Sequence, residues 1–150
     1  MRAVVQRVSE ATVSVEGEII ASIGCGLLVL LGLENADAEG DAEWLAGKIA
    51  HMRILDDGKG RMNRSLIDND GQAIVVSQFT LHASTRKGNR PSFLRAAGPD
   101  RANPLYEHFC TLLDAHLGRT VGRGRFGAMM KVALVNDGPV TIVIDSRNRE

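Results

Sequence analysis

The sequence "GLLVLLGL", residues 26–33, is the longest uninterrupted apolar run in the chain. Its length suits one strand, and it is far shorter than the roughly 18 residues that a bilayer-spanning helix needs. Because no polar residue interrupts it, the run predicts a strand that is buried on both faces. Such a strand lies inside a sheet, so the flanking sequence must supply neighbouring strands and a cover of helices.

Strand patterns lie on both sides of this run. Residues 3–24 alternate β-branched and polar side chains around Glu16-Gly17, which predicts two strands joined by a turn. Residues 72–81, "QAIVVSQFTL", predict another strand, and a short strand is expected near Met62. Residues 135–142, "VNDGPVTI", separate two further apolar runs. They predict a chain reversal, because Asn, Asp and Gly tolerate positive φ.

Two segments have helical periodicity. The first covers residues 41–54, with Asp41 as its expected N-cap. Its apolar positions are Ala42, Leu45, Ile49 and Met52. The second is expected to start with Asn103 as N-cap and Pro104 at the first helical position, and to end at Gly118. Its apolar positions are Leu105, Phe109, Leu112, Leu113 and Leu117.

The order of these elements predicts the fold class. Strands outnumber helices and do not alternate regularly with them, so a doubly wound parallel sheet is not expected. We expect one α+β domain over residues 1–150, with a curved, partly closed β-sheet and two main helices. Residues 1–8, "MRAVVQRV", lack the apolar stretch of a signal peptide, so a cytoplasmic protein without a membrane segment is expected. Cys25 and Cys110 are expected to be buried free thiols.

Charge is unevenly distributed along the chain. Residues 1–75 carry 7 basic and 12 acidic side chains, a balance of −5, and residues 76–150 carry 11 and 6, a balance of +5. Basic side chains gather at residues 86–95 and 119–131. Residues 82–100 also form a long polar loop, and loops of that length in a small domain are usually functional. These clusters are either phosphate-binding patches or ordinary solvated surface.

The usual signatures of catalysis are absent from the sequence. It contains no GxSxG elbow, no Walker A loop and no GxGxxG between a strand and a helix. Three of the four histidines, His51, His108 and His116, fall within predicted helices, where packing or surface roles are favoured over a role as a base; the fourth is His82. No His, Cys, Asp or Glu cluster has metal-ligand spacing, so neither a metal nor a cofactor is expected.

One short segment combines the right features for a site. Residues 77–81, "SQFTL", end an apolar strand and lead directly into the basic loop. Sites are often built where a strand opens into a loop. Backbone N–H groups at such an end can form an oxyanion hole, which stabilises a tetrahedral intermediate without a special side chain.

Over nearly its whole length the sequence resembles the D-aminoacyl-tRNA deacylases of the DTD family. The resemblance rests on "MRAVVQRV" at residues 1–8, "SQFTL" at 77–81, "GNRPSF" at 88–93 and "NDGPVT" at 136–141. It implies a carboxylic-ester hydrolase that releases D-amino acids and glycine from tRNA, which is a proofreading activity with chiral selectivity. It also implies a homodimer, with active sites at the subunit interface and tRNA as the partner.

The resemblance further implies a role for each matching residue. Ser77, Gln78, Phe79 and Thr80 would shape the catalytic pocket, with main-chain N–H groups near Phe79 and Thr80 as oxyanion donors. Gly138 and Pro139 would form a cis peptide that enters the partner subunit's active site as a chiral filter. The filter would be supported by Arg7, Asn136 and Thr141. The residues expected to bind adenosine or tRNA are Arg86, Lys87, Arg90, Phe126 and Met129.

Several alternatives stay open at this level. Thr80 is either a positioning residue or a nucleophile, and Phe126 and Met129 either line the adenosine site or pack in the core. The protein could be a non-catalytic RNA-binding module, which would share the basic loop. It could also be a deacylase with a trans Gly138-Pro139 peptide and relaxed chirality.

Overall fold

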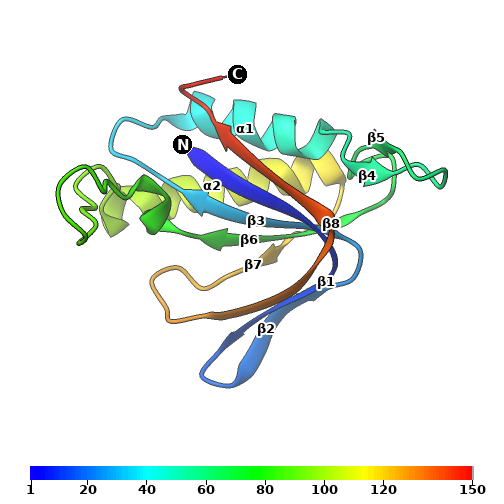
Figure 1. Cartoon of the computed structure of the whole chain (residues 1–150), viewed down its shortest axis with the longest axis horizontal. Coiled ribbons are helices and arrows are strands. Elements are labelled where there is room, and N and C mark those ends of the chain that lie inside the picture. Colours follow the sequence, from blue (N-terminus) through cyan, green and yellow to red (C-terminus); the bar gives the residue numbers. More distant parts are fainter. Residues whose placement is uncertain (150) are drawn as a thin grey trace.

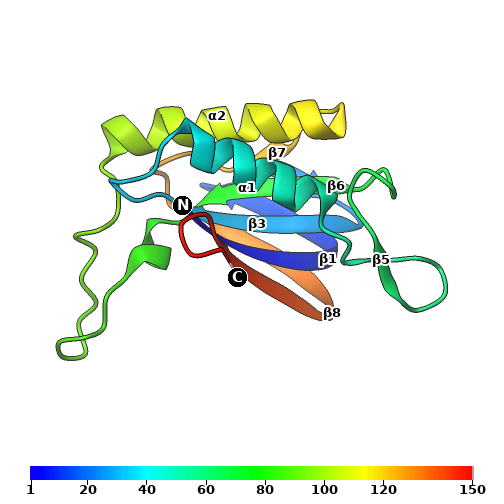
Figure 2. The same ribbon diagram turned by 90° about the horizontal axis from the view of Figure 1, so that it is seen from above.

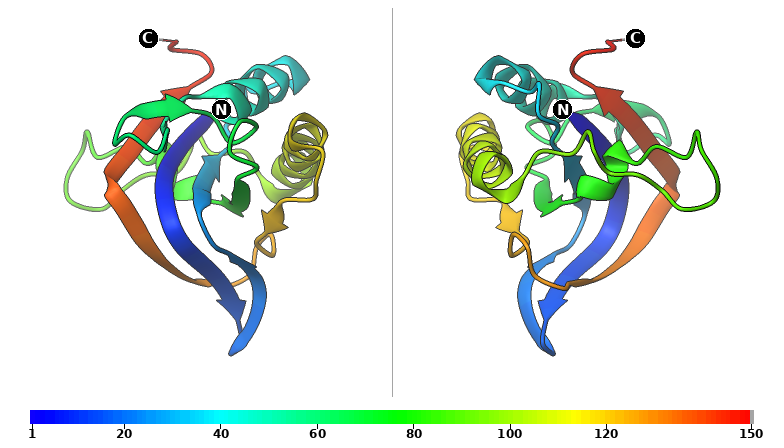
Figure 3. Two further views of the ribbon diagram at one scale, coloured as in Figure 1. Left: turned by 90° about the vertical axis from the view of Figure 1, so that its right-hand side faces the viewer. Right: turned by 90° about the vertical axis from the view of Figure 1, so that its left-hand side faces the viewer.

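The computed structural model describes residues 1–149, in which two helices cover one face of a curved sheet (Figures 1 and 2). The strands are β1 Arg2–Val15, β2 Glu18–Ile23, β3 Gly26–Gly32, β4 Leu55–Asp56, β5 Met62–Arg64, β6 Gln72–Ser77, β7 Gly122–Arg123 and β8 Lys131–Asp145. The helices are α1 Glu39–His51 and α2 Pro99–Leu117, with a short 3-10 helix, η1, at Phe79–His82. The predicted α+β class with a curved, partly closed sheet is confirmed (Figure 3).

The sheet is organised around β1. The first half of β1, Arg2–Val8, pairs with β3, and the second half, Ala11–Val15, pairs with β2. β8 pairs antiparallel with both halves along the other edge. β6 lies parallel to β3, and β7 lies parallel to β6. The predicted turn between β1 and β2 is confirmed, with positive φ at both Glu16 and Gly17.

β3 confirms the strand predicted from the apolar run at residues 26–33. It lies between β1 and β6, and all its residues except Leu30 are buried. Leu27, Val29 and Leu31 belong to the core beneath the two helices. Leu28 belongs to the second apolar cluster. An uninterrupted apolar sequence is thus explained by apolar packing on both faces of the strand.

Both helices exist, but each begins earlier than the sequence predicted. Ala38 is the N-cap of α1, so the prediction that Asp41 is the N-cap was wrong. Asp41 lies one turn in, where its carboxylate accepts a hydrogen bond from the Ala38 N–H at 3.0 Å. α2 begins at Pro99, so Asn103 and Pro104 lie inside the helix and do not start it. Pro99 takes the first helical position, where no N–H bond is lost, whereas Pro104 lies beyond the first turn and removes one helical hydrogen bond.

The strand predicted over residues 72–81 ends earlier. β6 stops at Ser77, and Phe79–His82 form η1. The Gln78 N–H donates to the Leu31 carbonyl at 2.7 Å, at the end of β3. A Cβ at Gly32 would lie 2.9 Å from the Leu81 Cβ, so the glycine allows η1 to fold closely over this end of the sheet. The expected strand was wrong here because close packing at the sheet end turns the chain.

The chain reversal predicted at residues 135–142 is also wrong. β8 is one continuous strand, and both of its halves pair with β1. The ladder is irregular at two adjacent places: the register passes from Gln6–Thr141 to Val8–Asn136 around Arg7, and it shifts again between Val8 and Glu10. We call residues 136–140 the β8 bulge. Asn-Asp-Gly-Pro suits a bulge as well as a turn, and the long neighbouring strand β1 determines which of the two forms.

Two smaller expectations can also be compared with the structure. Cys110 is buried as expected, whereas Cys25 is exposed, so the prediction was wrong for that thiol. Cys25 lies in the short connection between β2 and β3, outside both apolar clusters. Neither helix within residues 1–149 is both long and apolar enough to cross a membrane.

Candidate active site

A cavity of about 630 Å³ lies where β6 leaves the sheet. We call it the SQFTL cavity. Its walls come from the ends of β3 and β6, η1, the loop that follows η1, the start of α2 and the segment before β8. The lining residues are Leu31, Leu33, Val76, Ser77, Gln78, Phe79, Phe93, Ala96, Ala97, Pro99, Ala102, Phe126, Gly127, Ala128, Met129, Met130 and Val132. Apolar side chains predominate, as is usual for a cavity that holds a small organic group.

The first turn of η1 lies at this cavity. Phe79 and Thr80 are the first two residues of η1, and no side chain caps its N-terminus. The N–H groups of these two residues therefore have no partner inside the helix. The Thr80 hydroxyl accepts a hydrogen bond from the Gln78 side-chain amide at 2.6 Å. The geometry thus offers backbone N–H groups as hydrogen-bond donors. The Thr80 hydroxyl is hydrogen-bonded to an amide and not to a basic group that could remove its proton.

Aromatic and thioether side chains form the outer walls. Phe79 is 56% exposed, and its ring contacts that of Phe93 edge to face at 5.1 Å between centroids. Met129 is 91% exposed. Phe126 lines the cavity and also packs against the core, with its ring centroid 6.0 Å from that of Tyr106. Phe126 therefore both lines the cavity and packs against the core, whereas Met129 lines the cavity and is not a core residue.

The predicted filter residues gather at the β8 bulge. The Gly138–Pro139 peptide is cis, and both residues are exposed. The Arg7 Nε donates to the Asp137 carbonyl at 2.9 Å, and Nη1 of the same side chain donates to the Ile54 carbonyl at 2.9 Å. Arg7 also forms an ion pair with Asp137 at 3.2 Å. These contacts fix the residue immediately before the Gly-Pro pair.

Asn136 closes the bulge from within. Its side-chain amide donates to the Arg7 carbonyl at 2.9 Å and to the Val140 carbonyl at 3.0 Å, and so it spans the two ends of the irregular segment. Thr141 accepts a hydrogen bond from the Gln6 side chain at 3.2 Å, where regular pairing resumes. Arg7, Asn136 and Thr141, to which the resemblance gives a supporting role, thus lie together with the Gly-Pro pair.

The bulge and the SQFTL cavity are separate within one chain. Figure 1 shows the bend of β8 at one end of the molecule and η1, with the following loop, at the other. Neither Gly138 nor Pro139 is among the described residues that line the cavity. A single chain therefore does not bring these two groups of predicted residues together.

The basic loop lies beside the cavity but does not line it. Its base is closed by backbone hydrogen bonds between Ser84 and Ser92, at 2.8 and 2.9 Å. Arg86, Lys87 and Arg90 lie in the exposed tip between these two serines. Their position suits contact with a large ligand outside the cavity, and does not suit contact with a group inside it.

A buried polar cluster lies behind η1. The His82 side chain is fully buried, with its Nδ1 4.0 Å from a Glu34 carboxylate oxygen. Among residues 1–149, neither ring nitrogen of His82 has a hydrogen-bond partner. Burial raises the pKa of Glu34, but the hydrogen bond and charge of Arg95 outweigh this effect and hold that pKa below its usual value. Glu34 is therefore a carboxylate at neutral pH, paired with Arg95 at 2.7 Å.

The other histidines lie away from the SQFTL cavity. His51 and His116 contact each other edge to face, with 5.4 Å between ring centroids, and join α1 to α2. His108 is partly buried on α2. Within residues 1–149, no group of three or more His, Cys, Asp or Glu side chains is arranged to hold a metal ion.

The sequence did not identify Phe93 and its neighbours as cavity residues. Phe93, Ala96 and Ala97 come from the loop, and Pro99 and Ala102 from the unrecognised first turn of α2. Phe93 is an apolar residue inside a polar, basic loop, and this contrast is the signal that could have identified it as a cavity residue.

Comparison with known proteins gives consistent matches. Residues 4–145 match the family model described as D-Tyr-tRNA(Tyr) deacylase. Proteins named D-aminoacyl-tRNA deacylase from Flavobacterium johnsoniae and Bacteroides thetaiotaomicron are 59% and 55% identical to this chain, over 100% of both sequences in each case. One similar solved structure is titled "c-Myc DNA Unwinding Element Binding Protein". It has a TM-score of 0.92 and 39% identity, and the match covers 97% of this chain and 98% of that chain.

A more distant structure supports the fold alone. Its title is "Structural Analysis of a probable eukaryotic D-amino acid tRNA deacylase". The TM-score is 0.82 at 17% identity, and the match covers 95% of this chain and 97% of that chain.

Proposed function

Because the chain belongs to the D-Tyr-tRNA(Tyr) deacylase family, we propose that it hydrolyses the ester that joins a D-amino acid to the 3′ end of tRNA. The products are free D-amino acid and tRNA, and the reaction removes mischarged tRNA in the cytoplasm, where translation takes place. The observation that carries this proposal is the SQFTL cavity. It combines an apolar wall with an uncapped helix N-terminus, whose first N–H groups have no partner inside η1, in a chain with close relatives named as deacylases.

The chemistry requires little from side chains. An aminoacyl ester is already activated, so a positioned water and stabilisation of the developing oxyanion can be sufficient. The Phe79 and Thr80 N–H groups are the donors that we assign to this oxyanion. The ribose 2′-hydroxyl of the terminal adenosine would assist the attacking water. Phe126 and Met129 would contact the adenosine, as apolar cavity walls suit a nucleobase.

The β8 bulge is the part that we assign to chiral selection. Gly138 and Pro139 would enter the cavity of a second subunit and approach the α-carbon of the substrate. Two observations support this assignment: the pair is exposed at one end of the molecule, and the cavity lies at the other. A second copy of the chain is therefore the simplest source of the missing wall, which makes the active form a homodimer.

Selection by this wall would be steric. Gly138 carries no Cβ, so the backbone can approach an α-carbon that bears hydrogen on the near side. An L side chain would collide with that wall, whereas a D side chain would point away from it. Glycine carries hydrogen on both sides and would be accepted. Rejection of the wrong substrate, and not attraction to one side chain, would set the specificity.

The test is the release of amino acid from three substrates measured side by side. D-alanyl-tRNA and glycyl-tRNA should be hydrolysed, and L-alanyl-tRNA should not, with kcat/KM as the measured quantity. Alanine is the sharpest choice, because it has the smallest chiral side chain. Similar rates for the two alanyl esters would overturn the proposed filter.

The same assay separates this proposal from a binding module without catalysis, which one structural relative's title makes worth testing. A module of that kind would bind tRNA, but all three esters would be hydrolysed only at the spontaneous rate.

A further inference from the structure

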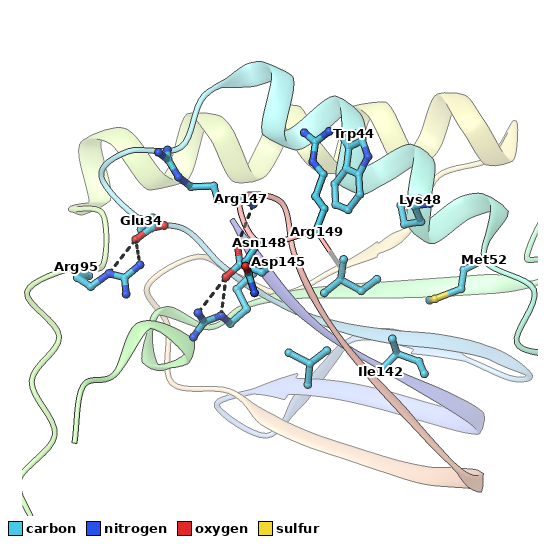
Figure 4. Close-up of a pocket in the computed structure, with 13 residues that line it drawn as sticks. Glu34, Trp44, Lys48, Met52, Arg95, Ile142, Asp145, Arg147, Asn148 and Arg149 are labelled. Carbon is cyan, nitrogen blue, oxygen red and sulfur yellow. Dashed lines mark hydrogen bonds and ion pairs between the residues drawn. The ribbon is translucent and has the colours of Figure 1, made fainter. Parts of the chain in front are cut away.

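A second cavity, of about 880 Å³, lies between α1, the end of β3 and the C-terminal part of β8 (Figure 4). We call it the cationic pocket. Its lining residues are Arg2, Glu34, Trp44, Lys48, Met52, Arg95, Ile142, Val143, Ile144, Asp145, Arg147, Asn148 and Arg149. Five of these side chains are cationic and two are acidic. The excess of positive charge is the first indication of an anionic ligand.

Both carboxylates of the pocket are already paired. Asp145 binds Arg2 at 3.0 Å, and Glu34 binds Arg95 at 2.7 Å. Burial raises the pKa of Asp145, but hydrogen bonds from the Arg147 N–H and from Arg2 outweigh it, and the pKa lies below its usual value. Two of the five cations are therefore neutralised at neutral pH, and three positive charges remain.

Within the described part of the chain, the three remaining cations lie outside ion-pair distance of any carboxylate, and the charge of Arg147 acts on the Asp41 carboxylate from further away. Among residues 1–149, none of Lys48, Arg147 and Arg149 forms an ion pair with a side chain. Each arginine uses one nitrogen on a backbone carbonyl: Arg147 on Ala36 at 2.6 Å and Arg149 on Ser146 at 2.8 Å. A guanidinium has five N–H donors and an ammonium has three, so most of the donors of these groups are left for a ligand.

An aromatic ring lies within the same pocket. The Arg149 guanidinium stacks over the Trp44 ring at 4.3 Å from its centroid, and the Lys48 ammonium lies at 5.7 Å (Figure 4). A stacked, planar guanidinium is held in one orientation and can carry a nucleobase on its outer face. Free phosphate would use the cations alone, whereas a nucleotide would use the stacked pair as well.

The cationic pocket and the SQFTL cavity share a wall. Phe93 and Ala96 line the cavity, and Arg95, between them in the chain, lines the pocket. Leu33 and Glu34 are divided in the same way. Adjacent Cα atoms are about 3.8 Å apart, so the two sites are close together. A polynucleotide with its 3′ end in the cavity could therefore reach the cationic pocket with its preceding nucleotides.

We propose that the cationic pocket binds the phosphodiester backbone of the tRNA acceptor strand, with one base stacked on the Arg149–Trp44 pair. The proposal rests on the proposed deacylase function, because the cavity fixes the 3′ end of that strand. It adds a second point of contact on the opposite side of the residue 93–97 wall from the cavity. The acceptor strand would then be bound by one set of residues, in the cationic pocket, and the ester would be hydrolysed by another, in the SQFTL cavity.

The experiment compares a long and a short substrate with the double variant Lys48→Glu/Arg149→Glu. The long substrate is D-alanyl-tRNA, and the short one is the D-alanyl ester of adenosine. Each phosphate contact changes the slope of log K against log salt by about 0.7 for a single strand and about 0.9 for a duplex, so the variant should lower the slope for tRNA by roughly 1.4 to 1.8. At low salt, KM for D-alanyl-tRNA should rise at least tenfold, and kcat/KM for the adenosine ester should stay unchanged.

Lys59→Glu/Arg61→Glu is the matched control. Both residues are exposed on the β4–β5 hairpin, at the end of the molecule away from η1, and the charge change is the same (Figure 1). This control should keep the wild-type salt slope. An equal effect in both double variants would reduce the proposal to a general charge effect and overturn it. Loss of binding only in Arg86→Glu/Lys87→Glu would place the tRNA on the basic loop and also overturn it.

Binding of uncharged tRNA, measured by fluorescence anisotropy, keeps this test independent of catalysis. If the wild-type protein hydrolyses neither ester, the deacylase function fails, but the anisotropy result still decides whether the pocket binds RNA. Binding of inorganic phosphate with unchanged tRNA affinity in the double variant would indicate a site for free anions and overturn the proposal. Trp44→Leu should weaken tRNA binding without changing the salt slope, because it removes the stack and leaves the charges.

Discussion

At the scale of single residues, the hydroxyl of Thr80 decides between two mechanisms. Within residues 1–149, the hydroxyl accepts a hydrogen bond from the Gln78 amide, and no imidazole or carboxylate is placed to remove its proton. We therefore expect Thr80→Ala to retain kcat within about tenfold of the wild type. Loss of a nucleophile or its base would instead cost several powers of ten. Single-turnover hydrolysis of D-alanyl-tRNA measures the difference.

Thr111→Ala is the control for Thr80→Ala. Its hydroxyl is exposed on α2 and donates only to the Glu107 carbonyl, so it should have no effect on rate. An acyl group trapped on Thr80 and detected by mass spectrometry would contradict a backbone-based mechanism. Complete loss of turnover in a folded Thr80→Ala variant would also contradict that mechanism.

At the same scale, the sequence predicted residues with local signatures and missed those without one. Gln78 and Gly138 belong to short motifs that can be read directly from the chain. Phe93 reaches the cavity only because the loop closes between Ser84 and Ser92, which no local pattern indicates. Lys48 and Arg149 share a pocket only because α1 and the end of the chain lie side by side in the fold.

At the scale of elements, α2 carries two buried ionisable groups on one face. Tyr106 and Cys110 are both completely buried, and the Tyr106 hydroxyl donates to the Val75 carbonyl of β6 at 2.8 Å. Burial raises the pKa of the Cys110 thiol from 9.0 to about 12, and burial also raises the pKa of Tyr106. The folded protein therefore keeps both protons at a pH where the unfolded chain loses them, and the free energy of unfolding must fall as pH rises above 9.

Cys110→Ser isolates one of these protons, because serine does not ionise in this range. Relative to wild type, the variant should lose less stability on going from pH 8.5 to 10.5. The difference should approach about 1.4 kcal/mol per pH unit above pH 9. Urea unfolding in reducing buffer measures it. Cys25→Ser alters an exposed thiol and is the control. Parallel curves for wild type and Cys110→Ser would contradict the burial argument.

Elements were predicted best where burial or a local sequence signal determines them. β3 follows from its apolar composition, and the end of α2 follows from Gly118, whose φ of 65° suits glycine. The β8 bulge could not be predicted, because Asn-Asp-Gly-Pro is locally compatible with a turn and with a bulge. Pairing of β8 along the full length of β1 selects the bulge, and that pairing is a long-range property of the fold.

At the scale of the whole molecule, the parts assigned to one active site lie at two ends of the molecule (Figure 1). Gly138 and Pro139 of the β8 bulge are exposed, and the exposed side chains of Phe79, Leu94 and Met129 lie on or beside the SQFTL cavity and its loop. Apolar side chains exposed together at a cavity mouth are typical of a surface that another molecule covers. A two-fold dimer that places each bulge at the partner's cavity would cover both in one step.

The final prediction tests that arrangement with two defective chains. Gly138→Ala should deform the bulge, because its φ of 148° is rarely adopted by other residues and the new Cβ would lie 2.6 Å from the Val140 nitrogen. Phe79→Ala should open the cavity wall. Each homodimer should lose at least about tenfold in kcat/KM for D-alanyl-tRNA, as each site would lack one positioning part. A heterodimer of the two, purified through different tags, should recover about half of the wild-type activity, because one of its two sites is intact.

The matched control carries the same two substitutions in a different arrangement. A heterodimer of the double variant Phe79→Ala/Gly138→Ala with a wild-type chain contains the same side chains in total. If the bulge acts across the interface, each site of this heterodimer combines one intact part with one defective part, and activity should stay low. If the bulge acts within its own chain, the outcomes exchange: this control would show half activity and the first heterodimer almost none. That exchange would rule out the cross-subunit filter.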